Sequence, residues 1–164
     1  MFVVRVLIAF FSYTGNTRAV AHHLAALLNS REVEVKVEEI QPTKRYTYLF
    51  WLLLSFIPNL RTSIKQPTLD PKGYDLICLG LPKWTLGCPP VNQYLEVVDL
   101  TGKVVGLFIT YGGFDGRRYL REMVKRLVKK GVKVKATLLL KRSRVKDGKI
   151  GEPLHKFCKA LLDL

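Results

Sequence analysis

Five short apolar segments alternate along the chain with amphipathic stretches, and this alternation constrains the fold more than any other feature. The first, residues 3–11, is an apolar, valine-rich run with Arg5 as its one charged residue, which is typical of a central parallel strand covered on both faces. In the second, Val33, Val35 and Val37 alternate with charged residues, as in a half-exposed edge strand. The other strands are expected at residues 74–81, 103–111 and 132–141.

Apolar residues at helical spacing fill the intervals between these strands. One such helix follows the first strand, and others are expected at residues 91–98, between Gly116 and Gly131, and from Pro153 onward. Strands alternating with helices predict an α/β fold with a doubly wound parallel sheet. Right-handed crossovers favour five strands in the order 2-1-3-4-5, with helices on both faces. A length of 164 residues suits one domain, so residues 1–164 are expected to form a single domain.

Residues 48–60 (YLFWLLLSFIPNL) depart from this regularity because they are apolar on nearly every side. As a helix they would span about 20 Å, which is shorter than the roughly 30 Å hydrocarbon core of a bilayer. Lys44, Arg45, Arg61 and Lys65 flank the segment, so peripheral contact with a membrane is one interpretation. The favoured interpretation is that the segment packs on the sheet and buries its remaining surface in a homodimer.

A burst of small polar residues, SYTGNT at residues 12–17, follows the first predicted strand. Ligands of open parallel sheets bind at the carboxyl ends of the strands, where this loop is expected to lie. Its hydroxyl and amide side chains, with free backbone N–H groups at a helix start, would form a cradle for a phosphate group. The chain has neither the GxxxxGK[ST] pattern of nucleoside-triphosphate loops nor the GxGxxG pattern of dinucleotide folds.

Three loop segments, in this order along the chain, resemble the flavodoxin family. The S-x-T-G-N-T sequence at residues 12–17 is similar to the family's loop for the phosphate of flavin mononucleotide (FMN). Residues 74–95 (YDLICLGLPKWTLGCPPVNQYL) resemble its third strand and first flavin-flanking loop, and residues 109–116 (ITYGGFDG) match the place of the second. The resemblance covers essentially the whole chain, and it implies a flavodoxin-like fold with FMN as the cofactor.

The resemblance assigns the candidate FMN-binding residues to three groups. The phosphate would be bound by Ser12, Tyr13, Thr14, Gly15, Asn16 and Thr17. One side of the isoalloxazine ring would be lined by Pro82, Lys83, Trp84, Thr85, Leu86 and Gly87, and the other by Thr110, Tyr111, Gly112, Gly113 and Phe114. Trp84 and Tyr111 are the stacking candidates, because large rings offer flat apolar area. Because the flavin would supply the chemistry, no side chain is expected to be catalytic.

These features favour an electron carrier that uses FMN to pass electrons between redox partners. An FMN-dependent reductase that transfers electrons from NAD(P)H to a quinone or a similar acceptor is the alternative, with residues 48–60 building its apolar site. Electron carriers of the family are usually acidic, whereas this chain has a formal net charge of +14. A redox partner with an acidic docking surface is therefore expected.

A basic module that binds nucleic acid or an anionic membrane is a third, less favoured class. It would use one face of the helix that begins near Gly116, with Arg117, Arg118, Arg121, Lys125, Arg126, Lys129 and Lys130. These cations are interpreted as a solvated face, and no aromatic residues are interleaved for base stacking. No nucleic acid is therefore expected as a partner.

The cysteines and histidines indicate neither a disulfide framework nor a metal site, because no CxxC pair or metal-ligand spacing occurs. Cys78 and Cys158 are expected in the core, and Cys88 is interpreted as structural. This usage fits a reducing compartment, so a cytoplasmic location is expected. The opening apolar run is interpreted as a strand rather than a signal peptide, since Arg5 interrupts it.

Overall fold

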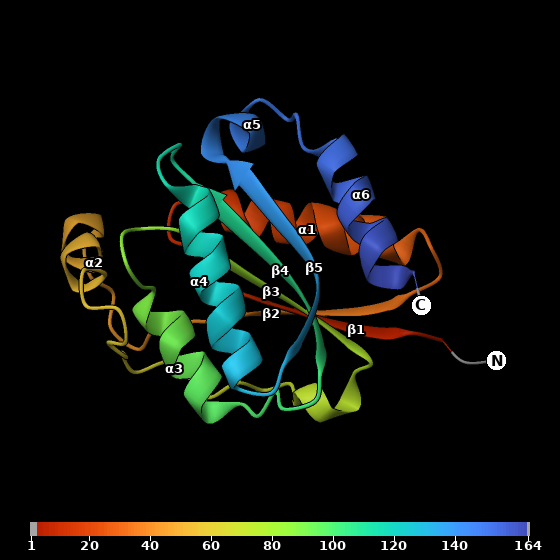
Figure 1. Cartoon of the computed structure of the whole chain (residues 1–164), viewed down its shortest axis with the longest axis horizontal. Coiled ribbons are helices and arrows are strands. Elements are labelled where there is room, and N and C mark those ends of the chain that lie inside the picture. Colours follow the sequence, from red (N-terminus) through yellow and green to blue (C-terminus); the bar gives the residue numbers. More distant parts are fainter. Residues whose placement is uncertain (1–2, 164) are drawn as a thin grey trace.

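The computed structural model describes residues 3–163 and places five parallel strands in one sheet (Figure 1). The strand order is β2-β1-β3-β4-β5, as the sequence predicts. The strands are β1 (Arg5–Phe10), β2 (Glu34–Glu39), β3 (Leu76–Pro82), β4 (Val104–Tyr111) and β5 (Lys133–Lys141).

Burial along the strands follows their position in the sheet. In β1 every residue after Arg5 is buried, because this strand pairs with β2 on one side and β3 on the other. In β2, exposed Glu34 and Lys36 alternate with partly buried Val35 and Val37, as expected of an edge strand. In β3, Gly80 is required by close packing, since a Cβ there would overlap the Phe108 ring of β4.

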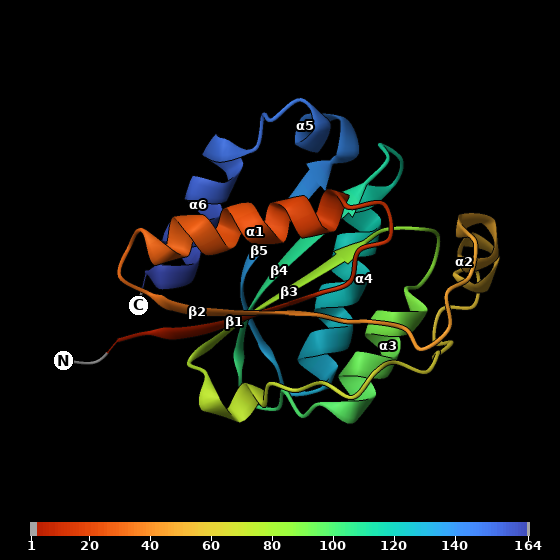
Figure 2. The same cartoon turned by 180° about the vertical axis from the view of Figure 1, so that it is seen from behind.

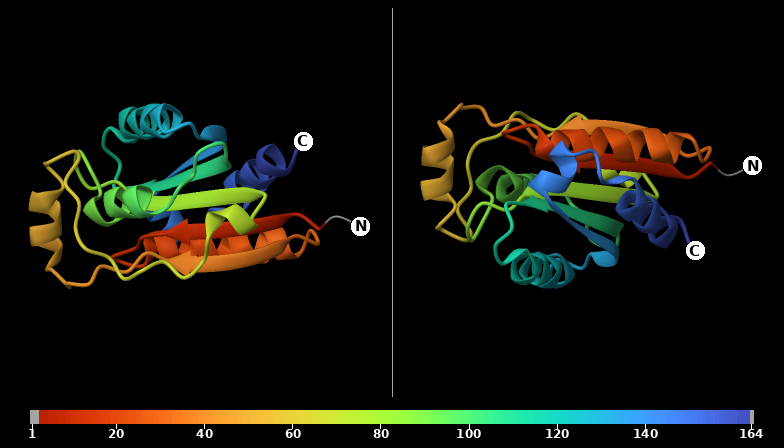
Figure 3. Two further views of the ribbon diagram at one scale, coloured as in Figure 1. Left: turned by 90° about the horizontal axis from the view of Figure 1, so that it is seen from below. Right: turned by 90° about the horizontal axis from the view of Figure 1, so that it is seen from above.

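Helices cover both faces of the sheet, as predicted. On one face, α1 (Asn16–Asn29) and α6 (Gly151–Leu162) pack on a core that contains Ile8 and Phe108. On the other face, α3 (Pro89–Val97) and α4 (Gly116–Lys129) pack on a core that contains Leu79 and Leu107. Figures 2 and 3 show α1 and α4 on opposite sides of the strands. The remaining short elements are η1 (Pro71–Gly73), a 3₁₀ turn, and α5 (Arg142–Lys146), which the sequence analysis did not predict.

The apolar segment 48–60 forms α2 (Tyr48–Leu54) and a following turn, and it lies beyond the carboxyl ends of the strands (Figures 1 and 3). Trp51 is buried in the core, and partly buried neighbours pack beside it. The expectation that the segment packs on the sheet is therefore wrong for most of its length. Five of its large apolar side chains are exposed, namely Leu49, Phe50, Leu53, Phe56 and Ile57. No helix within residues 3–163 combines the length and the hydropathy needed to cross a bilayer.

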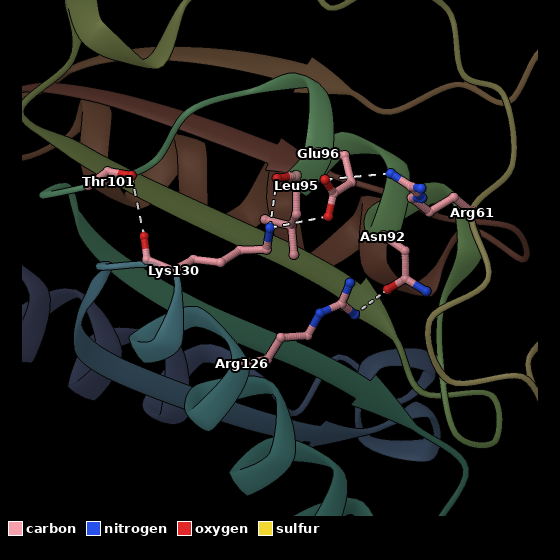
Figure 4. A network of polar contacts seen from close by, with 7 residues as sticks. All are labelled: Arg61, Asn92, Leu95, Glu96, Thr101, Arg126 and Lys130. Atoms are coloured by element: carbon pink, nitrogen blue, oxygen red, sulfur yellow. Dashed lines mark hydrogen bonds and ion pairs between the residues drawn. The ribbon is translucent and has the colours of Figure 1, made fainter.

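Asn92 of α3 is buried, and its hydrogen bonds connect α3 to the turn after α2 and to α4. Its amide nitrogen donates to the carbonyl oxygens of Pro58 at 3.1 Å and Leu60 at 2.7 Å, and its amide oxygen accepts from Arg126 (Figure 4). Nearby, Lys130 pairs with Glu96 at 3.3 Å. The interpretation of Arg126 as part of a solvated face is therefore wrong, because its side chain is partly buried against Asn92, whereas Lys130 stays partly exposed in its ion pair.

We expect Asn92→Ala to lower the free energy of unfolding by about 2–4 kcal/mol. The change leaves two carbonyl groups and the half-buried Arg126 guanidinium without this partner. Chemical denaturation followed by circular dichroism measures the loss. Asn59→Ala, in the exposed turn of the same segment, is the matched control and should cost less than about 0.5 kcal/mol. Equal losses for the two variants would contradict the role given to Asn92.

Candidate functional site

The three predicted loops lie together at the carboxyl edge of the sheet. They follow β1, β3 and β4, which are successive neighbours in the strand order. The Phe11 N–H donates to the Gly80 carbonyl at 3.0 Å, and the Lys83 N–H donates to the Thr110 carbonyl at 2.8 Å. These bonds continue the parallel pairing past the strand ends, so each loop begins in a fixed position relative to its neighbour.

The loop after β1 leads into the start of α1 and leaves that helix end uncapped. Gly15 has a φ of 96°, a left-handed conformation that favours glycine, and its N–H donates to the Ser12 hydroxyl at 3.1 Å. The Asn16 amide donates to the Thr14 hydroxyl at 3.1 Å. Within the described chain, no side chain caps the start of α1, and its first turn has no acidic residue. Backbone N–H groups at this helix end are therefore available to an acceptor.

A buried hydroxyl pair links the first loop to the third. Thr17 Oγ1 lies 2.8 Å from Thr110 Oγ1, and both side chains are almost completely buried. Thr17 is in the first turn of α1, and Thr110 is near the end of β4, so the bond crosses the end of the intervening β3. It fixes α1 against the strand that carries the last predicted loop.

A small pocket opens where the loops meet, and it brings together part of the predicted set. The predicted residues that line it are Ser12, Tyr13, Thr14, Thr17, Pro82, Lys83, Trp84 and Thr110. Tyr48 of α2 and Arg142 of α5 complete the lining, and the sequence analysis missed both. Arg142 directly follows the fifth predicted strand, so the strand pattern could have predicted its position at this edge. The alternation of strands and helices gave no signal for the position of Tyr48.

Aromatic rings surround this pocket, although not in the arrangement expected for free stacking surfaces. Trp84 is buried and stacks on Trp51, with ring centroids 5.7 Å apart and an interplanar angle of 27°. Tyr13 and Tyr48 form a second pair at 5.7 Å, and Tyr13 is 41% exposed. Tyr111 lies against the first residue of α4, Gly116, where a Cβ would be 2.7 Å from its ring. The predicted stacking of Trp84 and Tyr111 on a flavin stays a prediction.

The rest of the loop after β3 is held to the end of α2. The buried hydroxyl of Ser55 lies 2.7 Å from Thr85 Oγ1, and the Ser55 carbonyl accepts from the Leu86 N–H at 3.0 Å. Gly87 lies against the Pro58 carbonyl, and a Cβ there would be 2.6 Å from that oxygen. Residues 85–87 thus line the α2 side of the edge rather than the small pocket.

The loop after β4 is the most open of the three. Gly113 has a φ of 119°, and the Phe114 side chain that follows is 81% exposed. Lys83 Nζ lies 5.9 Å from the centre of the Phe114 ring, so a cation from the second loop contacts the third. A Cβ at Gly112 would overlap the Arg142 guanidinium, which places that cation directly beside this loop.

A larger groove of about 570 Å³ runs beside the second loop, between α4 and the turn after α2. Its basic side chains are Lys83, Arg118, Lys125, Arg126 and Lys129, and its acidic ones are Asp115 and Glu122. Arg118 pairs with Asp115 at 3.7 Å and Lys125 with Glu122 at 3.6 Å. The remaining cations give the groove a positive character.

The cysteines take no part in this site. Burial raises the pKa of the Cys88 thiol to about 12, so it is protonated at neutral pH, and its interpretation as a structural residue is supported. Cys78 and Cys158 are fully buried, as predicted, and burial also raises the pKa of each thiol. No cluster of His, Cys, Asp or Glu that would hold a metal ion occurs in the described part of the chain.

Comparison with known proteins gives the family of this chain. A family model described as flavodoxin matches residues 57–150, which is more than half of the sequence. The chain belongs to the flavodoxin family. It is 36% identical over 152 residues to an uncharacterized protein of Archaeoglobus fulgidus, covering 92% of this chain and 96% of that protein.

Solved structures agree with the family and the fold. A putative flavoprotein of Bacteroides uniformis has 26% identity and a TM-score of 0.70, covering 90% of this chain and 99% of that one. A flavoprotein of Lactobacillus acidophilus, solved in complex with FMN, has 19% identity and a TM-score of 0.68, covering 88% and 98%. The chain thus has the flavodoxin-like fold over nearly its whole length.

The buried hydroxyl pair of this flavodoxin-family chain gives a testable prediction. Thr17→Val and Thr110→Val should each lower the free energy of unfolding by about 1–2 kcal/mol, because each leaves the other hydroxyl buried without this partner. The double variant should cost less than the sum of the two, since neither hydroxyl then remains. Denaturant titration of all four proteins measures this coupling. Additive losses would show that the two hydroxyls do not depend on each other.

Proposed function

We propose that this flavodoxin-family protein binds FMN at the carboxyl edge of its sheet and transfers electrons between redox partners. The observation that carries the proposal is the meeting of three loops at this edge, where the hydroxyls of Ser12 and Thr14 adjoin the uncapped start of α1. A phosphate dianion requires such a set of donors. The FMN in the Lactobacillus acidophilus relative supports the choice of cofactor.

The residues present fit an anionic cofactor with a flat ring. The small pocket has the cations Lys83 and Arg142 in its lining and, among the described residues, no carboxylate. Arg18, which follows the loop, is paired with Glu39 through its guanidinium, so its charge is already balanced by a protein group. Tyr13, Tyr48 and Trp84 supply apolar ring surface at the same place.

Bound FMN would supply the electron-transfer chemistry, and the protein's part is to hold and tune it. Residues 12–17 would bind the phosphate, with residues 82–87 and 110–114 on the two sides of the ring. Lys83 and Arg142 add positive charge beside these loops, and positive charge favours a bound group that gains electrons. This role requires no proton transfer by a side chain.

The surface beside the proposed site supports a redox partner with an acidic docking surface. The groove between α4 and the turn after α2 starts at Lys83, which also lines the small pocket. Its cations would attract carboxylates of a partner at the edge where the flavin would be reached. Such complementarity increases the rate of encounter more than the final affinity.

Thr14→Val tests the phosphate site. The valine side chain is of similar size but lacks the hydroxyl, so we expect the dissociation constant for FMN to rise by roughly tenfold or more. The affinity for riboflavin, which lacks the phosphate, should change little. Fluorescence quenching of each flavin by the protein without bound flavin measures both constants.

Thr137→Val, at an exposed position of β5, is the matched control and should bind both flavins as the unaltered protein does. Unchanged FMN affinity in Thr14→Val, or an equal loss for FMN and riboflavin, would place the phosphate elsewhere.

A reductase acting on a small acceptor is the second candidate, and the groove of about 570 Å³ beside the second loop is the observation that favours it. The two functions differ in their need for another protein. As an electron carrier, the FMN-loaded protein should oxidise NAD(P)H with a quinone only when a separate flavodoxin reductase is added. NAD(P)H absorbance measures this directly. Rapid oxidation by the FMN-loaded protein alone would contradict the carrier and favour the enzyme.

A further inference from the structure

Exposed large apolar side chains gather at one end of the molecule. Eight of the eleven among the described residues belong to α2, the turn after it or the three loops of the candidate site. We call this set the apolar rim, and it consists of Tyr13, Leu49, Phe50, Leu53, Phe56, Ile57, Leu86 and Phe114. Large apolar side chains that gather at one end in this way indicate an interaction site, whereas single scattered ones are ordinary surface composition.

Contacts between its parts keep the apolar rim together. The Tyr13 ring packs against Tyr48 of α2, and the Leu86 N–H donates to the carbonyl of Ser55 at the end of α2. Phe114 is linked to the second loop through Lys83. Figure 3 shows α2 at the extreme end of the molecule, beyond the strands, so no other element covers it.

Basic residues flank the segment that carries five of the eight residues of the apolar rim, and acidic residues are absent from that segment. Residues 40–69 contain Lys44, Arg45, Arg61 and Lys65 but no Asp or Glu. All four side chains are exposed, and only Arg61 forms an ion pair with a described residue, to Glu96 at 3.5 Å. The segment therefore presents apolar and cationic groups on the same end of the molecule.

The combination of exposed apolar side chains and flanking cations indicates what kind of surface the apolar rim would bind. An anionic bilayer offers hydrocarbon to the apolar side chains and phosphate headgroups to the flanking cations, which an uncharged apolar surface does not. A second copy of the chain would bring like charges together around the apolar contact. We propose that the apolar rim docks into the interfacial layer of an anionic lipid bilayer, with Lys44, Arg45 and Lys65 against the headgroups.

The docking does not depend on FMN, because none of these contacts involves a flavin. It does set the orientation of the proposed site, since the small pocket and the apolar rim share Tyr13 and lie at the same edge. A docked molecule would hold that edge toward the headgroup layer, and an acceptor dissolved in the lipid would approach from this side.

Vesicle flotation tests the proposal with the protein of residues 1–164. Binding is compared between vesicles of phosphatidylcholine alone and vesicles of equal parts phosphatidylcholine and phosphatidylglycerol. We expect binding to the anionic vesicles only, and weaker binding as salt is added. The Leu53→Ser/Phe56→Ser variant and the Lys44→Gln/Arg45→Gln variant should each lower the lipid partition coefficient by about tenfold.

Matched controls separate the apolar rim from general surface properties. Val97→Ser/Val128→Ser changes two exposed apolar residues on other helices, and Lys156→Gln/Lys159→Gln removes two charges from α6. Both should bind anionic vesicles within about twofold of the unaltered protein. All substituted side chains are exposed, and circular dichroism verifies that each variant is folded.

Absence of binding to anionic vesicles would overturn the proposal. Binding that Leu53→Ser/Phe56→Ser leaves unchanged would also overturn it, because attraction of the net charge alone would then explain the result. Sedimentation in the absence of lipid tests the alternative that a second copy of the chain covers the apolar rim. A dimer that this variant converts to a monomer, together with no lipid binding, would assign the apolar rim to a contact between two copies. FMN affinity is measured separately, so failure of one proposal leaves the other standing.

Discussion

The candidate site depends on the parallel direction of its strands. Because β1, β3 and β4 are parallel neighbours, their carboxyl ends meet at one edge, and the three loops that follow them meet there too. The Thr17–Thr110 hydroxyl bond then fixes the start of α1 to the end of β4, across the end of β3. The sheet sets the edge at which the loops meet, and this buried contact fixes the first loop relative to the third.

The sheet and its loops were predictable because each rests on a local pattern. A buried parallel strand must be apolar on both faces, so residues 3–11 and 103–111 stand out without any knowledge of the partner strands. Once the strand order is inferred from the handedness of the crossovers, the position of residues 12–17 follows. The left-handed Gly15 also fits a local sequence signal, since glycine before a helix allows a turn that other residues resist.

The contacts that complete the site were not predictable, because they join segments by packing rather than by periodicity. A segment that is apolar all round is usually buried, yet only Trp51 of α2 is fully inside. Individual hydrogen bonds position α2. Ser55 bonds to the second loop, and Asn92 bonds to the turn that follows α2. The inward orientation of Arg126 has the same origin, since the run of cations in its helix gives no sign that one faces Asn92.

The distribution of charge explains how the proposed phosphate site, which has no lysine in its loop, is consistent with a net charge of +14. Salt screens exposed charges over about 8 Å at physiological ionic strength, so cations far around the surface contribute little to a bound phosphate. A bound phosphate would therefore have to be held by short-range donors. The hydroxyls of the first loop and the N–H groups at the start of α1 are such donors. The distant cations act instead on large anionic surfaces, because many weak attractions add up over an extended area. In the proposed function, the local donors would bind a small cofactor, and the net charge would attract a large anionic partner.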